Sequence, residues 1–301
     1  MQQRLSLSTV LLLATPPLLW AANAVVGRLL AGTVPPITLN FIRWMLAFAL
    51  LLPFAGWVLR RGGPFWPRWR RYWLVGLLGV GCYNALQYLA LTTSSPVNTT
   101  LVGASSPIFI LAFGALFYGK AITGRQMLGA ALSMAGVLVV LARGEPAQLA
   151  QVRFVIGDVY MLLATLSWAW YSWLLADIGA DAPEVRNDWT AFLMVQIVPG
   201  LMWSGLFAAG EWAVAPRHIE WSATLLIALA FVAIFPAILA YRAFGMGVQR
   251  VGPSVVSFFA NLTPLFAALL ATAFLGEPPR VYHGLAFALI VGGILVSSRR
   301  H

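Results

Sequence analysis

Ten apolar stretches, each long enough to cross a lipid bilayer, divide this chain of 301 residues. A membrane-spanning helix needs about 20 mainly apolar residues. The connections between the stretches are short and leave no room for a sizeable soluble domain. We therefore predict an all-α integral membrane protein with ten transmembrane helices, at Leu5–Leu29, Ile37–Leu59, Tyr72–Leu91, Val97–Tyr118, Ile122–Leu141, Val155–Ala176, Trp189–Ala209, Trp221–Phe244, Ser254–Leu275 and Val281–Ser297.

The composition excludes several classes of protein. Hydrophobic residues make up 60% of the chain and charged residues 9%, whereas a soluble domain has about 25% charged residues. The net charge is +10, but the basic residues form short clusters between apolar stretches, so we expect no nucleic-acid partner. The sequence has no metal-ligand spacing, no nucleophile–base pair and no phosphate-binding glycine loop. We therefore expect no enzyme activity, no metal and no cofactor.

The basic residues predict the orientation in the membrane. Cytoplasmic loops carry an excess of Lys and Arg, and the segment 60–71 holds five arginines. Placing the N-terminus inside puts that segment and most other basic residues on the cytoplasmic side. With ten spans, both termini are then cytoplasmic.

The two halves of the chain, 1–148 and 149–301, resemble each other. Adding 157 to a residue number converts Pro96 to Pro253, Pro107 to Pro264 and Gly136 to Gly293. Five spans per half is an odd number, so the second half enters the membrane inverted. Inverted repeats are typical of secondary transporters that work by alternating access. A duplication would leave the same trace in a channel or a non-transporting scaffold, and we keep that alternative open.

Several short segments together resemble a known family. They are Arg43-Trp44, Ser106-Pro107-Ile108-Phe109, Phe117-Tyr118-Gly119-Lys120, Gly157-Asp158-Val159-Tyr160, Ser167-Trp168-Ala169-Trp170-Tyr171 and Pro264-Leu265-Phe266-Ala267. In combination the chain resembles the EamA-like branch of the drug/metabolite transporter superfamily, and among its members the aromatic amino acid exporters most closely. This resemblance implies a ten-helix exporter of small metabolites in the inner membrane of a bacterium.

Polar and aromatic residues share one face in four of the predicted helices. Polar groups inside a span need partners or a watery cavity, since lipid offers neither. We expect these faces to enclose one substrate cavity, lined by Trp20, Asn23, Tyr83, Asn84, Gln87, Trp168, Tyr171, Ser257 and Asn261. The alternative for the small polar residues is simple helix-to-helix bonding.

Rings and neutral hydrogen-bonding groups suit a small amphipathic substrate. Trp and Tyr can stack on an aromatic ring or cover a cation. We therefore predict export of amino acids, including aromatic ones, or of related metabolites, with aromatic cations or drugs as the alternative. Pro107 and Pro264 are the predicted hinges, because proline interrupts helix hydrogen bonding.

Two further features leave alternatives open. Arg43 lies inside the second predicted helix, where it would attract a carboxylate, extend its charge toward the interface or pair with a carbonyl at the C-terminus of a helix. Two stripes of small residues, Gly129 and Ser133 in the fifth predicted helix and Gly284, Ala288 and Gly292 in the tenth, favour close helix packing, within the fold or between subunits. We expect a monomer or a weak homodimer, surrounded by lipid.

Overall fold

The computed structural model describes residues 6–30, 32–151, 153–214, 218–275 and 280–298. Within these ranges the chain is helical and has no strand. Ten of its helical segments are long and apolar enough to span a membrane, at Leu7–Gly27, Pro36–Leu59, Trp66–Leu91, Asn98–Tyr118, Gly124–Leu141, Ile156–Ala176, Trp189–Val214, Ala223–Val251, Pro253–Leu270 and Val281–Ser298. The ten predicted spans are confirmed, although the predicted start at Leu5 lies outside the described residues.

The spans are built from continuous and from divided helices. In chain order the helices are α1 (Leu7–Leu29), α2 (Pro36–Ala55), η1 (Gly56–Leu59), η2 (Trp66–Arg68), α3 (Trp69–Gly76), η3 (Leu77–Cys82), α4 (Tyr83–Leu91), α5 (Pro96–Ala104), α6 (Ser106–Tyr118), α7 (Gly124–Leu141), η4 (Pro146–Gln151), α8 (Ile156–Ala176), η5 (Ile178–Ala180), α9 (Pro183–Asn187), α10 (Trp189–Val214), α11 (Ala223–Val232), η6 (Ala233–Leu239), α12 (Ala240–Val251), α13 (Pro253–Ala260), α14 (Thr263–Leu275) and α15 (Val281–Ser298).

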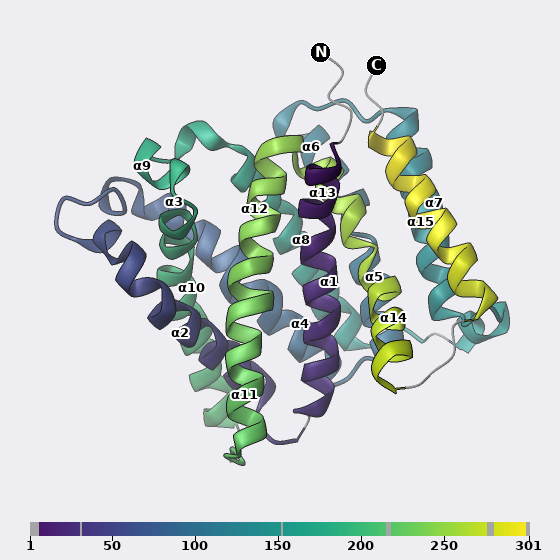
Figure 1. The fold of residues 1–301 in the computed structure, drawn as a ribbon, viewed down its shortest axis with the longest axis horizontal. Coiled ribbons are helices and arrows are strands. Elements are labelled where there is room, and N and C mark those ends of the chain that lie inside the picture. Colours follow the sequence, from purple (N-terminus) through teal and green to yellow (C-terminus); the bar gives the residue numbers. More distant parts are fainter. Residues whose placement is uncertain (1–5, 31, 152, 215–217, 276–279, 299–301) are drawn as a thin grey trace.

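The helices form one bundle (Figure 1). α8, α1 and α12 occupy its middle, α2 packs on α10 on one side, and α7 packs on α15 on the other. The start of α1 and the end of α15 lie on the same face, which we call the N-terminal face. The chain is thus an all-α membrane protein made of two inverted five-helix repeats.

Some spans are longer than their apolar stretches. The eighth span continues to Val251 and the seventh to Val214, past the predicted ends at Phe244 and Ala209. In both cases the helix runs on into residues that include polar side chains, such as Gln249 and Glu211. Hydrophobicity marks the part of a helix inside the hydrocarbon, and backbone hydrogen bonding continues beyond it.

The two predicted hinge prolines lie at breaks in their spans. α5 ends at Ala104 and α6 begins at Ser106, just before Pro107. α13 ends at Ala260 and α14 begins at Thr263, just before Pro264. Proline fits the first turn of a helix but restricts the residue before it, which explains why each break precedes its proline.

A second pair of irregularities also follows the repeat. The third span contains the π-helical segment η3 and the eighth contains η6, and the offset of 157 superimposes the two. π-helical turns are rare and occur frequently at functional sites. Both segments adjoin the centre of the bundle.

The contact between α7 and α15 depends on small residues. A Cβ at Gly129 would lie 2.7 Å from the carbonyl oxygen of Gly293, and a Cβ at Gly293 would lie 2.6 Å from that of Gly129. Two such glycines allow the backbones to approach closely. The predicted stripe of α7, Gly129 and Ser133, takes part in this contact, whereas Gly284 and Ala288 of the predicted stripe in α15 are exposed on another face of that helix.

Candidate substrate site

Six aromatic rings from four spans meet in the middle of the bundle. Trp168 of α8 is their centre and is only 4% exposed. We call this group the ring cluster. The distances from the centroid of the Trp168 ring are 5.4 Å to Trp20, 4.7 Å to Tyr83, 5.0 Å to Tyr171, 5.7 Å to Tyr241 and 4.7 Å to Phe244. Tilted and edge-on pairs of this kind each contribute about 0.5–1.5 kcal/mol beyond area burial.

Hydrogen bonds fix the polar ends of these rings. The Tyr241 hydroxyl donates to the carbonyl of Gly79 (2.7 Å) and accepts from the Asn84 amide (3.1 Å). The Tyr171 hydroxyl donates to Oε1 of Gln196 (2.7 Å). Both tyrosines are buried, so their hydroxyls need these partners. The rings are therefore oriented before any substrate arrives.

The π-helical segment η3 lets the first repeat approach the cluster. A Cβ at Gly79 would lie 2.4 Å from Cε2 of Tyr171, which is closer than real side chains approach. Glycine is thus required for Tyr171 to lie against this turn. The same residue supplies the carbonyl that Tyr241 binds.

A cavity connects the ring cluster with the N-terminal face. It has a volume of about 200 Å³ and extends from α9 along α10 and α12 to Gln196 and Tyr241. Its charged lining residues are Arg186 and Arg242, and the Arg242 guanidinium lies 4.4 Å from the centroid of the Trp189 ring. Ligand pockets usually measure about 300–1,000 Å³, so this one admits a small molecule only if it widens.

The structure brings some of the predicted site residues together and separates others. Trp20, Tyr83, Trp168 and Tyr171 belong to the ring cluster, and Asn84 bonds to it. Asn23 and Gln87 lie on the same helices as Trp20 and Asn84, and both are half-buried.

The two predicted residues of the ninth span have other partners. Asn261 is 4% exposed, and its amide donates to Ser133 Oγ (2.8 Å) and to the Ala104 carbonyl (3.3 Å). Ser257 donates to the Ser254 carbonyl within its own helix (2.7 Å). In this conformation Asn261 joins neighbouring helices, and Ser257 bonds within its own helix.

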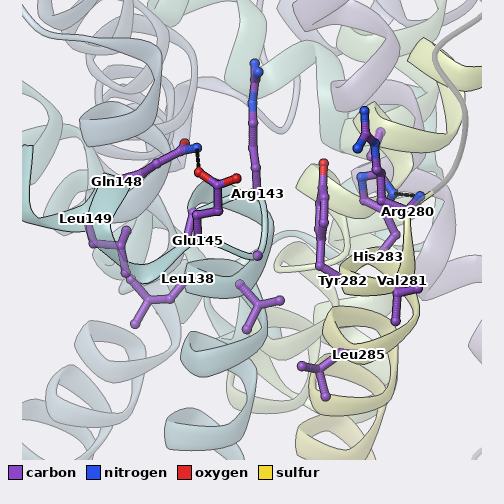
Figure 2. Close-up of a pocket in the computed structure, with 14 residues that line it drawn as sticks. Leu138, Arg143, Glu145, Gln148, Leu149, Arg280, Val281, Tyr282, His283 and Leu285 are labelled. Carbon is purple, nitrogen blue, oxygen red and sulfur yellow. Dashed lines mark hydrogen bonds between the residues drawn. The ribbon is translucent and has the colours of Figure 1, made fainter.

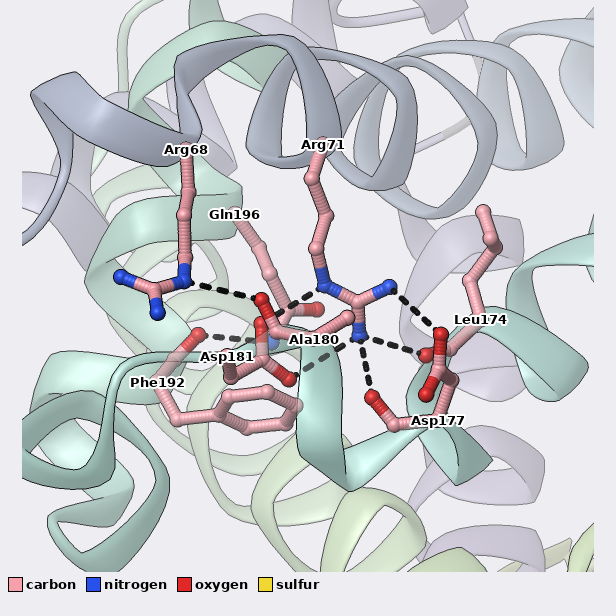
Figure 3. Close-up of polar contacts among 8 residues, drawn as sticks. All are labelled: Arg68, Arg71, Leu174, Asp177, Ala180, Asp181, Phe192 and Gln196. Carbon is pink, nitrogen blue, oxygen red and sulfur yellow. Dashed lines mark hydrogen bonds and ion pairs between the residues drawn. The ribbon is translucent and has the colours of Figure 1, made fainter.

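The two repeats are joined on the N-terminal face by Arg71 (Figure 3). Its guanidinium forms a two-pronged pair with Asp181, with Nε to Oδ1 at 2.8 Å and Nη2 to Oδ2 at 3.0 Å. Nη2 also donates to the carbonyls of Leu174 and Asp177 at the end of α8. Nearby, Nε of Arg68 donates to the Ala180 carbonyl (3.0 Å). We call these contacts of Arg71 the Arg71 latch.

The opposite face is joined by two buried carboxylates of the second repeat. Asp158 accepts from the Ser94 hydroxyl, from the Asn98 amide (3.0 Å) and from the backbone N–H of Val155 (2.8 Å). This carboxylate thereby ties α8 to the junction between α4 and α5.

The second carboxylate, Glu211 of α10, caps the start of α2. It accepts from the backbone N–H and the hydroxyl of Thr38, at 2.8 and 2.7 Å. Polar contacts therefore join the two repeats on both faces, and the ring cluster is packed between them.

A larger cavity of about 1070 Å³ lies on that opposite face, between the end of α7, η4 and the start of α15 (Figure 2). Arg143 and Glu145 are exposed at its mouth. Its walls include none of the six rings of the cluster.

Sequence reasoning missed several residues of the site, namely Gly79, Gln196, Tyr241 and Phe244. One signal was present, because the repeat offset of 157 converts Asn84 to Tyr241. Gln196 lies in α10, which is apolar on all sides, and Phe244 is itself apolar, so a search for polar faces singles out neither residue.

Ten spans in two inverted halves, with a ring-lined centre between them, define a polytopic membrane protein with the architecture of a transporter. The chain belongs to the EamA-like transporter family, whose profile matches residues 7–142 and 155–299.

Named relatives are similar over nearly the whole chain. An uncharacterized transporter of Archaeoglobus fulgidus is 25% identical, and the alignment covers 97% of this chain and 98% of that transporter. The uncharacterized inner membrane transporter YedA of Escherichia coli is 25% identical over 93% of this chain and 87% of its own. The aromatic amino acid exporter YddG of Ancylobacter novellus is 24% identical over 97% of each chain.

A solved crystal structure has the same fold. It superimposes with a TM-score of 0.75 over 96% of each chain, at 23% sequence identity. The ten-span arrangement of this protein is therefore one that has been observed experimentally.

Proposed function

We propose that this transporter exports amino acids, aromatic ones among them, or related small metabolites by alternating access. The observation that carries the proposal is the ring cluster around Trp168, which both repeats build and which a cavity reaches from the N-terminal face. Aromatic side chains of a substrate can replace ring–ring contacts of the cluster at little cost. The relative named an aromatic amino acid exporter supports the same substrate class.

The charges along the cavity favour amino acids over aromatic cations. Its charged lining residues are both arginines. A cation would be repelled there, whereas a carboxylate is attracted.

The proposal includes a location and a direction. We infer a multi-pass protein of the bacterial inner membrane with the N-terminal face in the cytoplasm, because the basic residues from Arg60 to Arg71 lie at that face. The YedA relative is named as an inner membrane protein. Cytoplasmic substrate would then enter through the cavity below α9. We propose a monomer or weak homodimer that has no cofactor and no enzyme activity. The concentration gradient of the substrate would drive transport.

Counterflow in liposomes tests this function. Purified protein is reconstituted, the vesicles are loaded with unlabelled L-phenylalanine, and uptake of labelled L-phenylalanine is followed. A carrier gives a transient, saturable accumulation of label that other amino acids reduce. A channel gives no accumulation and a scaffold gives no flux, and either result would overturn the proposal.

A further inference from the structure

Arg43 places a positive charge inside the bundle without an acidic partner. Its side chain is 2% exposed, so it does not extend to the membrane interface. Both ion pairs found among the described residues involve Arg71 instead. Burial of a charge without a counter-charge is strongly unfavourable. Such a residue inside a membrane protein therefore calls for a functional explanation.

Three buried hydrogen-bond donors at this place have no acceptor among the residues that the structure describes. They are Nδ2 of Asn40, Nε of Arg43 and Nε1 of Trp44. Residues spaced by three and four positions share one face of a helix, so these atoms belong to one face of α2. We call them the α2 donor group. The Asn40 carbonyl oxygen already accepts from Nη2 of Arg43 (2.8 Å), which leaves its amide nitrogen free to donate.

The α2 donor group adjoins the ring cluster. The Trp44 ring meets the Tyr241 ring edge-on, with centroids 4.8 Å apart, and the Arg43 guanidinium lies 5.2 Å from the centroid of the Trp44 ring. Tyr241 is also the residue at which the cavity from the N-terminal face ends. A molecule that displaces Tyr241 thus reaches rings and unpaired donors together.

We propose that the α2 donor group binds the carboxylate of the transported substrate. Unpaired donors call for an acceptor, and a fixed positive charge calls for a negative one. A carboxylate supplies both, and it matches the fork of an arginine. This inference rests on the proposed function and adds the residues that select for an acid group.

Competition by matched ligands tests the assignment. Counterflow of labelled L-phenylalanine is inhibited by unlabelled L-phenylalanine or by L-phenylalanine amide, which keeps the ring and the amine but has no carboxylate. In the unaltered protein the amide should inhibit at least about tenfold more weakly, as expected for a lost charge-assisted pair. In Arg43→Met this difference should disappear, because phenylalanine weakens while the amide does not.

Two further variants secure the result. Trp44→Phe keeps the ring and removes one donor, and it should reduce the preference for phenylalanine over the amide severalfold. Arg125→Met removes an exposed arginine at the start of α7 and should change nothing. Thermal melting of Arg43→Met should show only a small change, because loss of the bond from Nη2 to Asn40 is offset by removal of a buried charge.

The outcomes separate the two proposals. No counterflow of phenylalanine in the unaltered protein would contradict the proposed function. Counterflow with an undiminished preference for phenylalanine in both Arg43→Met and Trp44→Phe would overturn the carboxylate site alone. Equal weakening of both ligands would assign these residues a structural role and would also overturn it.

Discussion

Asn84 and Tyr241 are separated by 157 residues, which is the offset of the repeat, and their side chains are hydrogen-bonded to each other at 3.1 Å. Equivalent positions of the two halves therefore meet in the middle of the bundle. The bond from Asn261 to Ala104 has the same separation. Both contacts place equivalent positions of the two repeats side by side in the interior, and the Asn84–Tyr241 contact lies at the ring cluster.

The Asn84–Tyr241 bond should be a measurable link between the halves. Tyr241→Phe removes the hydroxyl and leaves the Gly79 carbonyl and the Asn84 amide buried without this partner. We expect a loss of about 1–3 kcal/mol in the free energy of unfolding, measured by thermal melting in detergent. Asn84→Leu in the Tyr241→Phe background should cost less than Asn84→Leu alone. Strict additivity of the two changes would contradict a direct link.

Gly79 should not tolerate even a methyl side chain without loss of stability. Gly79→Ala places a methyl group into the Tyr171 ring, and overpacking of this kind costs about 1–3 kcal/mol. Gly27→Ala is the matched control, because that helical glycine has open space around its Cβ position. Melting temperatures of the two variants are compared. A fall of equal size in both would mean that the close approach to Tyr171 is not what limits this position.

The Arg71 latch should control access to the cavity on the N-terminal face. Asp177 and Asp181 lie on the segment that leads into α9, which covers the cavity. In a Cys82→Ser background, Met246→Cys provides a thiol in the cavity wall. Arg71→Ala should speed the labelling of that thiol severalfold, measured with a membrane-impermeant maleimide in inside-out vesicles.

Arg70→Ala is the control for the latch, because Arg70 is exposed and its contact is with the Trp69 ring. This variant should label at the rate of the parent protein. Equal acceleration in both variants would point to a general loosening of the loop, and no acceleration in Arg71→Ala would contradict the gating role.

Asp158 should be a structural carboxylate rather than a proton carrier. Three donors surround its carboxylate in the first turn of the sixth span. Asp158→Asn replaces one acceptor oxygen by a donor, so we expect a loss of about 1–3 kcal/mol of stability. Efflux from liposomes with and without a pH gradient should keep the same ratio as in the parent. A strong proton dependence that Asp158→Asn abolishes would contradict this assignment.

The lengths of the apolar stretches and the internal repeat predicted most of the fold, whereas the side-chain contacts of the site are visible only in the structure. Helical spacing places Asn261 on a polar face, but it does not say which neighbour that face contacts. Here the contact is with Ser133 and Ala104, which ties the ninth span to the fourth and fifth. Rotation of a helix about its axis depends on packing against the other helices, and one sequence does not contain that information.

The surroundings of Arg43 also could not be predicted from the sequence. Its position in the sequence was equally compatible with an extended side chain at the interface and with a buried charge. Burial of the guanidinium, together with the unpaired atoms of Asn40 and Trp44, is visible only in three dimensions.

Replacement of Trp168 tests whether its ring lines the substrate site. Counterflow of labelled L-phenylalanine and of labelled L-leucine is measured for the parent protein, for Trp168→Ala and for Trp170→Ala, whose indole is 43% exposed on the same helix. Trp168→Ala should lower phenylalanine counterflow roughly five- to tenfold and leucine counterflow clearly less, and Trp170→Ala should leave both unchanged. Equal losses for the two substrates in Trp168→Ala would contradict a ring-lined substrate site.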